Sequence, residues 1–159
     1  MGQKSLARWL KIILLGVALC GAVVYAGVIP TLGKGFAWMF PDLSHCFWPW
    51  LIFLWVSGVP CYGVLVLGWR IASNIGRDRS FCIENAKLLQ WISVLAAGDA
   101  GFFFLGNVVF LLWNWSHPSV VLGSLLIVFA GVAVAVAAAA LSHLVKKSAV
   151  LQEESDWTI

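Results

Sequence analysis

The sequence predicts an all-α polytopic membrane protein, with four transmembrane helices in a bundle and both termini in the cytoplasm. Of its 159 residues, 62% are hydrophobic and only 11% are charged, whereas a soluble domain carries about 25% charged residues. The mean hydropathy is +0.94. Because the apolar segments fill most of the chain, we expect a single membrane domain over 1–159 and no separate soluble domain.

Four apolar segments have the length of a membrane span. They cover about 12–29, 50–69, 92–113 and 120–141, and a helix needs about 20 apolar residues to cross a bilayer. The first is longer than the apolar core of a signal peptide, roughly 7–15 residues, so we expect it to stay in the protein. Pro30 predicts the end of this helix and a loop over 30–49, and Pro60 predicts a kink in the second.

Basic residues lie almost entirely on one side of these segments. Only Lys34 falls on the other side, among ten lysines and arginines in all. The nine on the favoured side are Lys4, Arg8, Lys11, Arg70, Arg77, Arg79, Lys87, Lys146 and Lys147. Since short cytoplasmic loops carry an excess of Lys and Arg, this bias places the N-terminus, the loop 70–91 and the tail 142–159 in the cytoplasm.

The tryptophans give a second indication of the same topology. Trp9, Trp69 and Trp91 border the segments on the predicted inner side. Five others border them on the outer side: Trp38, Trp48, Trp50, Trp113 and Trp115. Because tryptophan is enriched at both membrane–water interfaces, these two groups are typical of two aromatic belts.

The fourth segment contains a pattern of small residues. Gly131, Ala135 and Ala139 recur every four residues, the small-xxx-small spacing that lets two membrane helices approach closely. An alanine-rich helix without a specific contact seam would show the same spacing, and the sequence leaves the two alternatives open.

Two passages resemble a known family. The inner loop contains Gly76, Phe81, Asn85, Ala86 and Leu88 at the spacing of the inner-loop motif of the YoaS-like family of small bacterial four-helix membrane proteins. Cys82 stands where that family prefers Ser or Thr, which weakens the expected cap of the following helix because a thiol is a poorer acceptor than a hydroxyl.

The second passage is the C-terminus. The ending resembles the family's terminal pattern through Leu151, Glu154, Asp156, Thr158 and Ile159, with Trp157 in place of a leucine. The family is catalogued as a domain of unknown function, and its members have no established enzymatic activity. The resemblance implies a bacterial cytoplasmic (inner) membrane, and a small cytosolic helix-turn-helix regulator as partner, because many members are encoded beside one.

Two functional hypotheses follow. In the first, the protein is a regulatory or scaffolding protein whose cytoplasmic loop and tail bind a small partner. The partner-binding residues are then Arg77, Arg79, Phe81, Asn85, Glu154, Asp156, Trp157, Thr158 and Ile159. In the alternative, the protein is a small transporter or channel subunit that uses Asp99, and it forms a homo-oligomer because four helices leave little room for a pore.

Asp99 and Asn107 are the notable polar residues within the third segment. A charged side chain at the centre of the bilayer costs at least about 2.5–3.5 kcal/mol, so Asp99 is expected to face the other helices. It is either a proton or ion site, or a protonated carboxyl that holds a neighbouring helix by a hydrogen bond. The sequence leaves both alternatives open.

Other chemistry is weakly represented. We find no nucleophile–base set, P-loop or dinucleotide motif, and therefore expect no enzymatic activity and no cofactor. Asp42, His45, Cys46 and His117 are suitable metal ligands, but their spacing does not predict a site, so we expect no metal. The few basic residues of the loop favour lipid headgroups over direct binding of nucleic acid.

Overall fold

The computed structural model describes residues 2–157, and every regular element in this range is helical. The elements are α1 (Gln3–Val23), the π-helical turn η1 (Val24–Val28), α2 (Ile29–Met39), the 3-10 helix η2 (Pro41–Cys46), α3 (Phe47–Gly76), α4 (Ile83–Leu112) and α5 (Pro118–Trp157). Because α1, η1 and α2 follow one another without a break, they form one column, and four columns are long and apolar enough to cross a membrane. The predicted all-α fold with four spans is confirmed.

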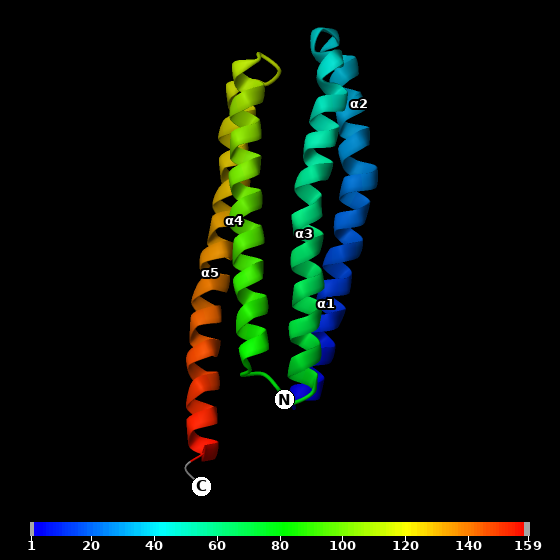
Figure 1. Ribbon diagram of the computed structural model, residues 1–159. Helices are drawn as coiled ribbons and strands as arrows, with labels where there is room; N and C mark the ends of the chain where they lie inside the picture. The colour runs from blue at the N-terminus through cyan, green and yellow to red at the C-terminus, as the bar shows by residue number, and fades with distance from the viewer. Residues whose placement is uncertain (1, 158–159) are drawn as a thin grey trace.

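The columns alternate in direction, so that both described ends of the chain lie at the same end of the molecule (Figure 1). The connection 77–82 between α3 and α4 lies there too, and we call this end the loop end. The turn 113–117 and η2 lie at the opposite end. Residues predicted to share one side of the membrane therefore share one end of the structure.

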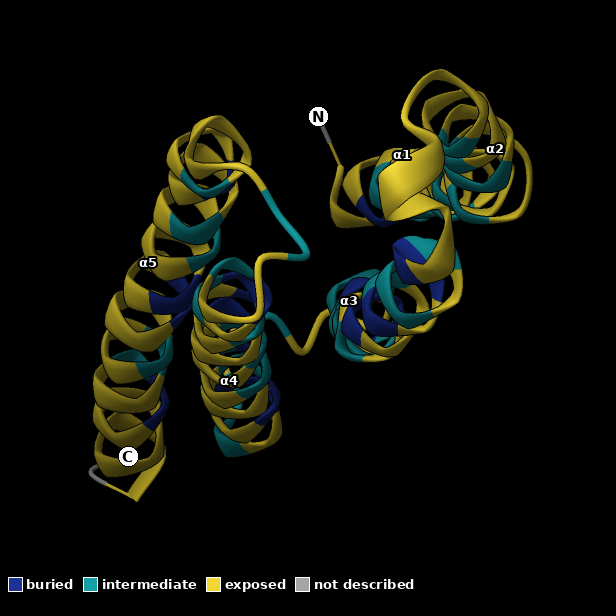
Figure 2. Cartoon of the chain, turned by 90° about the horizontal axis from the view of Figure 1, so that it is seen from above, coloured by how far each residue is buried: buried dark blue, intermediate teal, exposed yellow. Residues whose placement is uncertain are grey.

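The helices pack in a row and do not close into a ring (Figure 2). Within the described range, α1 packs on α3, α3 on α4 and α4 on α5, and α1 has no backbone neighbour in α4 or α5. The predicted bundle is therefore open, with α1 and α5 at its two edges. Each seam of the row is therefore formed mainly by two neighbouring helices.

The seam between α1 and α3 is built on glycines. A β-carbon added to Gly76 of α3 would lie 3.2 Å from Ala7, and one added to Gly68 would lie 3.2 Å from Leu14. One added to Gly58 would lie 3.1 Å from Tyr25. At the fourth contact, the α1 glycine Gly21 lies against the hydroxyl of Tyr62. The partners on the column of α1 and η1 recur at intervals of seven, seven and four residues, the periodicity of a left-handed antiparallel helix pair.

The column continues through Pro30, where the sequence predicted a helix end and the loop 30–49. Ile29 N–H bonds the carbonyl of Val24, five residues back, and on this spacing the next carbonyl, that of Tyr25, would pair with Pro30. Proline has no N–H, and the Tyr25 carbonyl instead accepts a hydrogen bond of 3.1 Å from Trp55 Nε1 of α3. The loop prediction is wrong because the π-helical turn and a side chain of the next helix compensate for the proline.

Small residues also make the seam between α4 and α5. One side of α5 is buried or half-buried at intervals of four and three residues over four heptads: Ser124, Val128, Gly131, Ala135, Ala138, Ser142, Val145 and Ala149. A β-carbon on Gly131 would lie 3.1 Å from that of Ala100, and Ser142 Oγ donates a 2.6 Å hydrogen bond to the carbonyl of Ala86. Of the two alternatives left open, the specific contact seam is confirmed at Gly131 and Ala135, whereas Ala139 is exposed and Ala138 takes its place in the seam.

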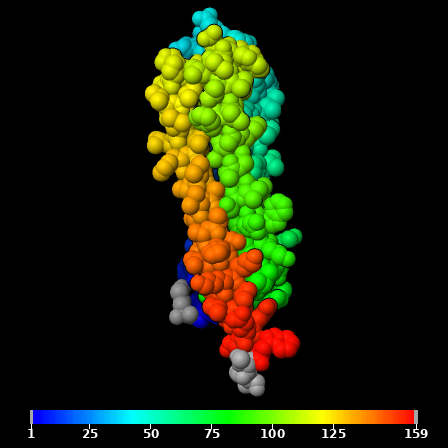
Figure 3. All heavy atoms as spheres, turned by 60° about the vertical axis from the view of Figure 1, so that its left-hand side comes forward, coloured from blue at the N-terminus to red at the C-terminus, as the bar shows by residue number. Residues whose placement is uncertain are grey.

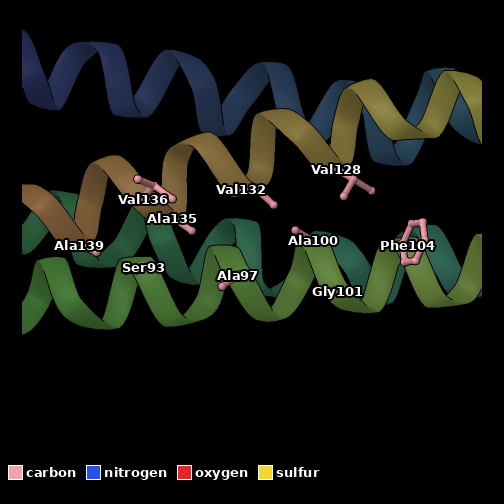
Figure 4. A pocket seen from close by; sticks show the side chains of 10 residues that line it. All are labelled: Ser93, Ala97, Ala100, Gly101, Phe104, Val128, Val132, Ala135, Val136 and Ala139. Atoms are coloured by element: carbon pink, nitrogen blue, oxygen red, sulfur yellow. The ribbon is translucent and has the colours of Figure 1, made fainter.

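Beside this seam runs a shallow apolar groove of about 450 Å³ (Figure 4). It is lined by small side chains of α4 and α5, among them Ala97, Gly101 and Val132, and Ala139 of the predicted motif lies at its edge. The groove exists because these side chains are too short to fill the space between the two helices.

The heptads of α5 continue past residue 141, where the sequence predicted the start of a polar tail over 142–159. The helix reaches Trp157, and its buried Ala149 shows that the seam extends beyond the apolar segment. Thr158 and Ile159 lie outside the described residues. α3 likewise continues through Pro60.

The seam between α3 and α4 is aromatic at the end opposite the loop end. Phe53, Phe103 and Phe110 form a buried cluster, and Trp50 and Val128 pack against it. Trp50 Nε1 also donates a 3.1 Å hydrogen bond to the carbonyl of Trp115. This cluster joins α3, α4, α5 and the turn 113–117.

We predict that Gly106→Ala destabilises this seam, because the new β-carbon would overlap the ring of Phe53, which the surrounding cluster holds in place. Overpacking costs about 1–3 kcal/mol, measured by thermal unfolding in detergent. Gly98→Ala is the matched control on the same helix, since a β-carbon there meets nothing within 4 Å. Equal stability of the two variants would contradict the packing described for Phe53.

Candidate functional site

The loop end presents charged and aromatic side chains from a short connection. Arg77, Arg79 and Phe81 are exposed, and the exposed fraction of Phe81 is 53%. Asp78 has a φ of 59°, a left-handed conformation that Asp tolerates better than most residues. This turn lets the chain reverse from α3 into α4 within six residues.

Asn85 holds this connection from inside. Its side chain is 1% exposed; its Oδ1 accepts a 2.8 Å hydrogen bond from Asn74 Nδ2, and its Nδ2 donates to the carbonyls of Arg79 at 3.1 Å and Ser80 at 3.0 Å. The backbone N–H of Arg79 in turn bonds the carbonyl of Asn74 at 3.0 Å. These bonds fix the backbone from which Arg79 and Phe81 project.

The predicted partner-binding role therefore takes a different form for Asn85 than for its neighbours. Because its side chain is inaccessible, Asn85 can act on a partner only by shaping the connection. Arg77, Arg79 and Phe81 are accessible, and their contact with a partner remains a prediction.

Three separate segments meet at a polar cleft beside this connection. The cleft, of about 260 Å³, is lined by Gln3, Gln152 and the consecutive residues 78–82. Ser80 Oγ donates a 2.9 Å hydrogen bond to Gln3 Oε1, which ties α1 to the connection. The predicted loop and tail thus lie side by side, a juxtaposition that the sequence alone did not place.

The last turns of α5 extend past the connection between α3 and α4 (Figure 1), and the chain narrows to this helix at that end of the molecule (Figure 3). Glu154, Asp156 and Trp157 are exposed, and the exposed fraction of Trp157 is 90%. The indole of Trp157 is therefore not docked on the loop end. It stands at the tip of a projecting helix.

A second polar group lies within the apolar part of the molecule. Asp99 Oδ2 accepts a hydrogen bond from the Cys61 thiol of α3 at 3.6 Å, and the hydroxyl of Ser57, one turn before Cys61, is also within hydrogen-bonding reach of the carboxyl. Tyr25 of η1 also lies within hydrogen-bonding reach of Cys61. Of this group, the sequence analysis identified only Asp99. Ser57 and Cys61 share one face of their helix beside Pro60, and this pattern could have indicated polar partners for a membrane carboxyl.

Asn107 does not join this group. It lies eight residues from Asp99 along α4, about 12 Å at 1.5 Å per residue. Its side chain is 0% exposed, and its Nδ2 donates a 2.7 Å hydrogen bond to the carbonyl of Phe103. The two predicted intramembrane polar residues therefore belong to separate environments.

The residues considered as metal ligands are not brought together. His45 Nε2 lies 3.2 Å from Cys46 Sγ, but His117 Nδ1 lies 2.8 Å from Ser119 Oγ. Among the residues described here, no three His, Cys, Asp or Glu side chains are grouped so that they could hold a metal ion.

Fold and sites together define a small four-span helical membrane protein with an ordered polar connection and a helical projection at one end. The sequence model of the family described as "Protein of unknown function (DUF2975)" matches residues 31–159, and the chain belongs to this family. It is 25% identical over 152 residues, 94% of each chain, to "Uncharacterized membrane protein YoaS" of Bacillus subtilis (strain 168). The predicted YoaS-like resemblance is confirmed. No solved structure matches significantly.

We predict that Asn85→Ala loosens the connection, because the Asn74 amide and two carbonyls lose a buried partner. Leaving buried polar groups unpaired costs about 1–3 kcal/mol each, so trypsin should cleave faster at Arg77 and Arg79 in membranes that expose the loop end. Lys87→Ala, an exposed position one half-turn on, is the control and should leave the cleavage rate unchanged. An unaltered rate in Asn85→Ala would refute the bracing role.

Proposed function

We propose that this chain is a non-enzymatic regulatory or scaffolding protein of the bacterial cytoplasmic membrane. Its loop end faces the cytoplasm, and the connection 77–82 and the end of α5 bind a small cytosolic protein there. The uncharacterised relative and the family description support only its being a membrane protein; the proposal is based on the arrangement of the loop end.

The position of Trp157 is the observation that carries the proposal. From 142 to 157 the helix rises about 22 Å, whereas the headgroup layer on each side of the hydrocarbon is only about 5–7 Å thick. An indole that is 90% exposed at this distance is beyond the interfacial region that tryptophan prefers. Exposed tryptophans outside the membrane mark protein interfaces, where they are enriched among the residues that dominate binding energy.

The connection 77–82 supplies a second, pre-ordered part of this surface. Arg79 and Phe81 project from a backbone that Asn85 holds, so a partner would lose little conformational entropy in binding them. Arginine and aromatic side chains are also the types enriched at interfaces. The family resemblance makes a small helix-turn-helix regulator the first partner to test.

The cytoplasmic orientation is supported by the nine basic residues that border the loop end. We predict that green fluorescent protein fused after Ile159 is fluorescent in a bacterial host and that alkaline phosphatase fused there is inactive. The same reporters inserted in the turn 113–117 should give the reverse pattern. Active phosphatase at the C-terminus would overturn the orientation and, with it, a cytosolic partner.

We predict that a photo-reactive amino acid placed at Trp157 or Phe81 cross-links a small cytosolic protein in living cells. The matched control is Trp38, which is 86% exposed but lies at the opposite end of the molecule. Trp157→Ala should reduce the cross-link formed from position 81 at least about tenfold, as expected for a residue worth over 1.4 kcal/mol.

Two results would contradict the proposal. Identical cross-linked products at 157 and 38 would show that the products do not depend on this surface. If the photo-reactive group at position 157 cross-linked only lipid, the end of α5 would lie in the membrane. This would contradict a projection of α5 into the cytoplasm.

A further inference from the structure

The four apolar segments contain one ionisable side chain of the Asp, Glu, Lys and Arg types, Asp99. A charged carboxylate in hydrocarbon costs at least about 2.5–3.5 kcal/mol, and none of these segments carries a basic residue that could offset the charge. A carboxyl in this setting takes up a proton and becomes neutral. The question is whether the surroundings only bury this proton or also allow it to leave.

The surroundings of Asp99 are polar on two helical columns. Cys61 donates to Oδ2 at 3.6 Å, Ser57 reaches the same carboxyl, and Tyr25 of η1 reaches Cys61. Thiol, hydroxyl and phenol each donate and accept hydrogen bonds. They can therefore accept from a protonated carboxyl and donate to an ionised one, which stabilises both states.

One oxygen of the carboxyl has no protein partner. Asp99 Oδ1 is buried and makes no hydrogen bond, although an unsatisfied buried polar atom costs about 1–3 kcal/mol. This cost is larger for a charged group, so the missing partner favours the protonated, neutral form of the carboxyl.

Local backbone features bring the third column to this place. Gly58 lets the Tyr25 ring approach α3, since a β-carbon there would lie 3.1 Å from the ring. The bond from Trp55 to the carbonyl of Tyr25 holds the π-helical turn against α3. π-helical turns of this kind occur frequently at functional sites.

We propose that Asp99, Cys61, Ser57 and Tyr25 form a proton-binding site within the bilayer. Asp99 holds one exchangeable proton at neutral pH, and Cys61 and Tyr25 form a hydrogen-bonded chain from the carboxyl to the α1 column. The other titratable side chain nearby is Tyr62 of α3, whose hydroxyl donates to the carbonyl of Ala18 at 2.9 Å. This proposal is independent of partner binding at the loop end and stands if that binding fails.

The test uses dicyclohexylcarbodiimide, an apolar reagent that enters bilayers, on the full chain in liposomes. The protonated carboxyl adds across a C=N bond of the reagent: the carboxyl oxygen bonds its carbon, the proton goes to its nitrogen, and the adduct rearranges to a stable N-acylurea. We expect one label, mapped to Asp99 by mass spectrometry, whose rate falls as the pH is raised. Asp99→Asn should take no label in this peptide.

Cys61→Ala tests the role of the neighbours. Without the thiol, the ionised carboxyl loses a hydrogen-bond donor, so the pH at which half of the labelling is lost should be higher than in the unaltered chain. At the pH that halves labelling of the unaltered chain, Cys61→Ala should therefore be labelled faster. Cys20→Ala is the matched control, because Cys20 is an exposed thiol in an apolar segment of α1 and should leave the pH profile unchanged. If Asp99 had a purely structural role, Cys61→Ala would impair folding and would leave the pH dependence of labelling at Asp99 unchanged.

If Asp99→Asn does not fold, infrared spectroscopy of the unaltered chain provides a second test. The stretching band of a protonated carboxyl should disappear as the pH rises, with recovery on return to neutral pH. Absence of label at Asp99, labelling that does not depend on pH, or equal profiles for Cys61→Ala and Cys20→Ala would each overturn the proposed site.

Discussion

The structure depends on close antiparallel packing at α4, which forms one seam with α3 and another with α5. Helices gain little from hydrophobic association in lipid, since lipid tails are as apolar as the side chains, so van der Waals contact and hydrogen bonds must hold them. Toward α5, Gly131 meets Ala100; toward α3, Gly106 receives the ring of Phe53. Among the described residues α1 and α5 have no backbone contact, so the row does not close on itself and depends on these seams.

Hydrogen bonds between polar side chains set the register of α3 on α4. Asn74 meets Asn85 at the loop end, and Cys61 meets Asp99 fourteen residues further along α4. Both α4 residues thus occupy the same heptad position, where a polar pair between two helices disfavours a shifted alignment. The register that these pairs set also creates the two candidate sites: the braced connection with its exposed Arg79, and the carboxyl in the membrane.

The apolar segments sufficed to predict the four spans and the shared end of both termini, because length and hydropathy determine which helices can cross a bilayer. Pro30 was misinterpreted because its effect depends on a tertiary contact, the bond from Trp55 to the preceding turn. The helical end of α5 could have been found, since its small-residue heptads extend to Ala149. The partners of Asp99 could not have been found in this way, because they lie on another helix and only the register of α3 on α4 brings them to the carboxyl.

The most direct test of the packing at α4 is disulfide formation between engineered cysteines, with Cys20, Cys46, Cys61 and Cys82 replaced. Oxidation in membranes should join cysteines at 100 and 131, because a β-carbon at Gly131 would lie 3.1 Å from that of Ala100, close enough for a disulfide after a small adjustment of the two helices. The pair at 98 and 131 should remain reduced, since Gly98 has no neighbour within 4 Å of a β-carbon. Cross-linking of 98 with 131 instead of 100 would contradict the register of α5 on α4.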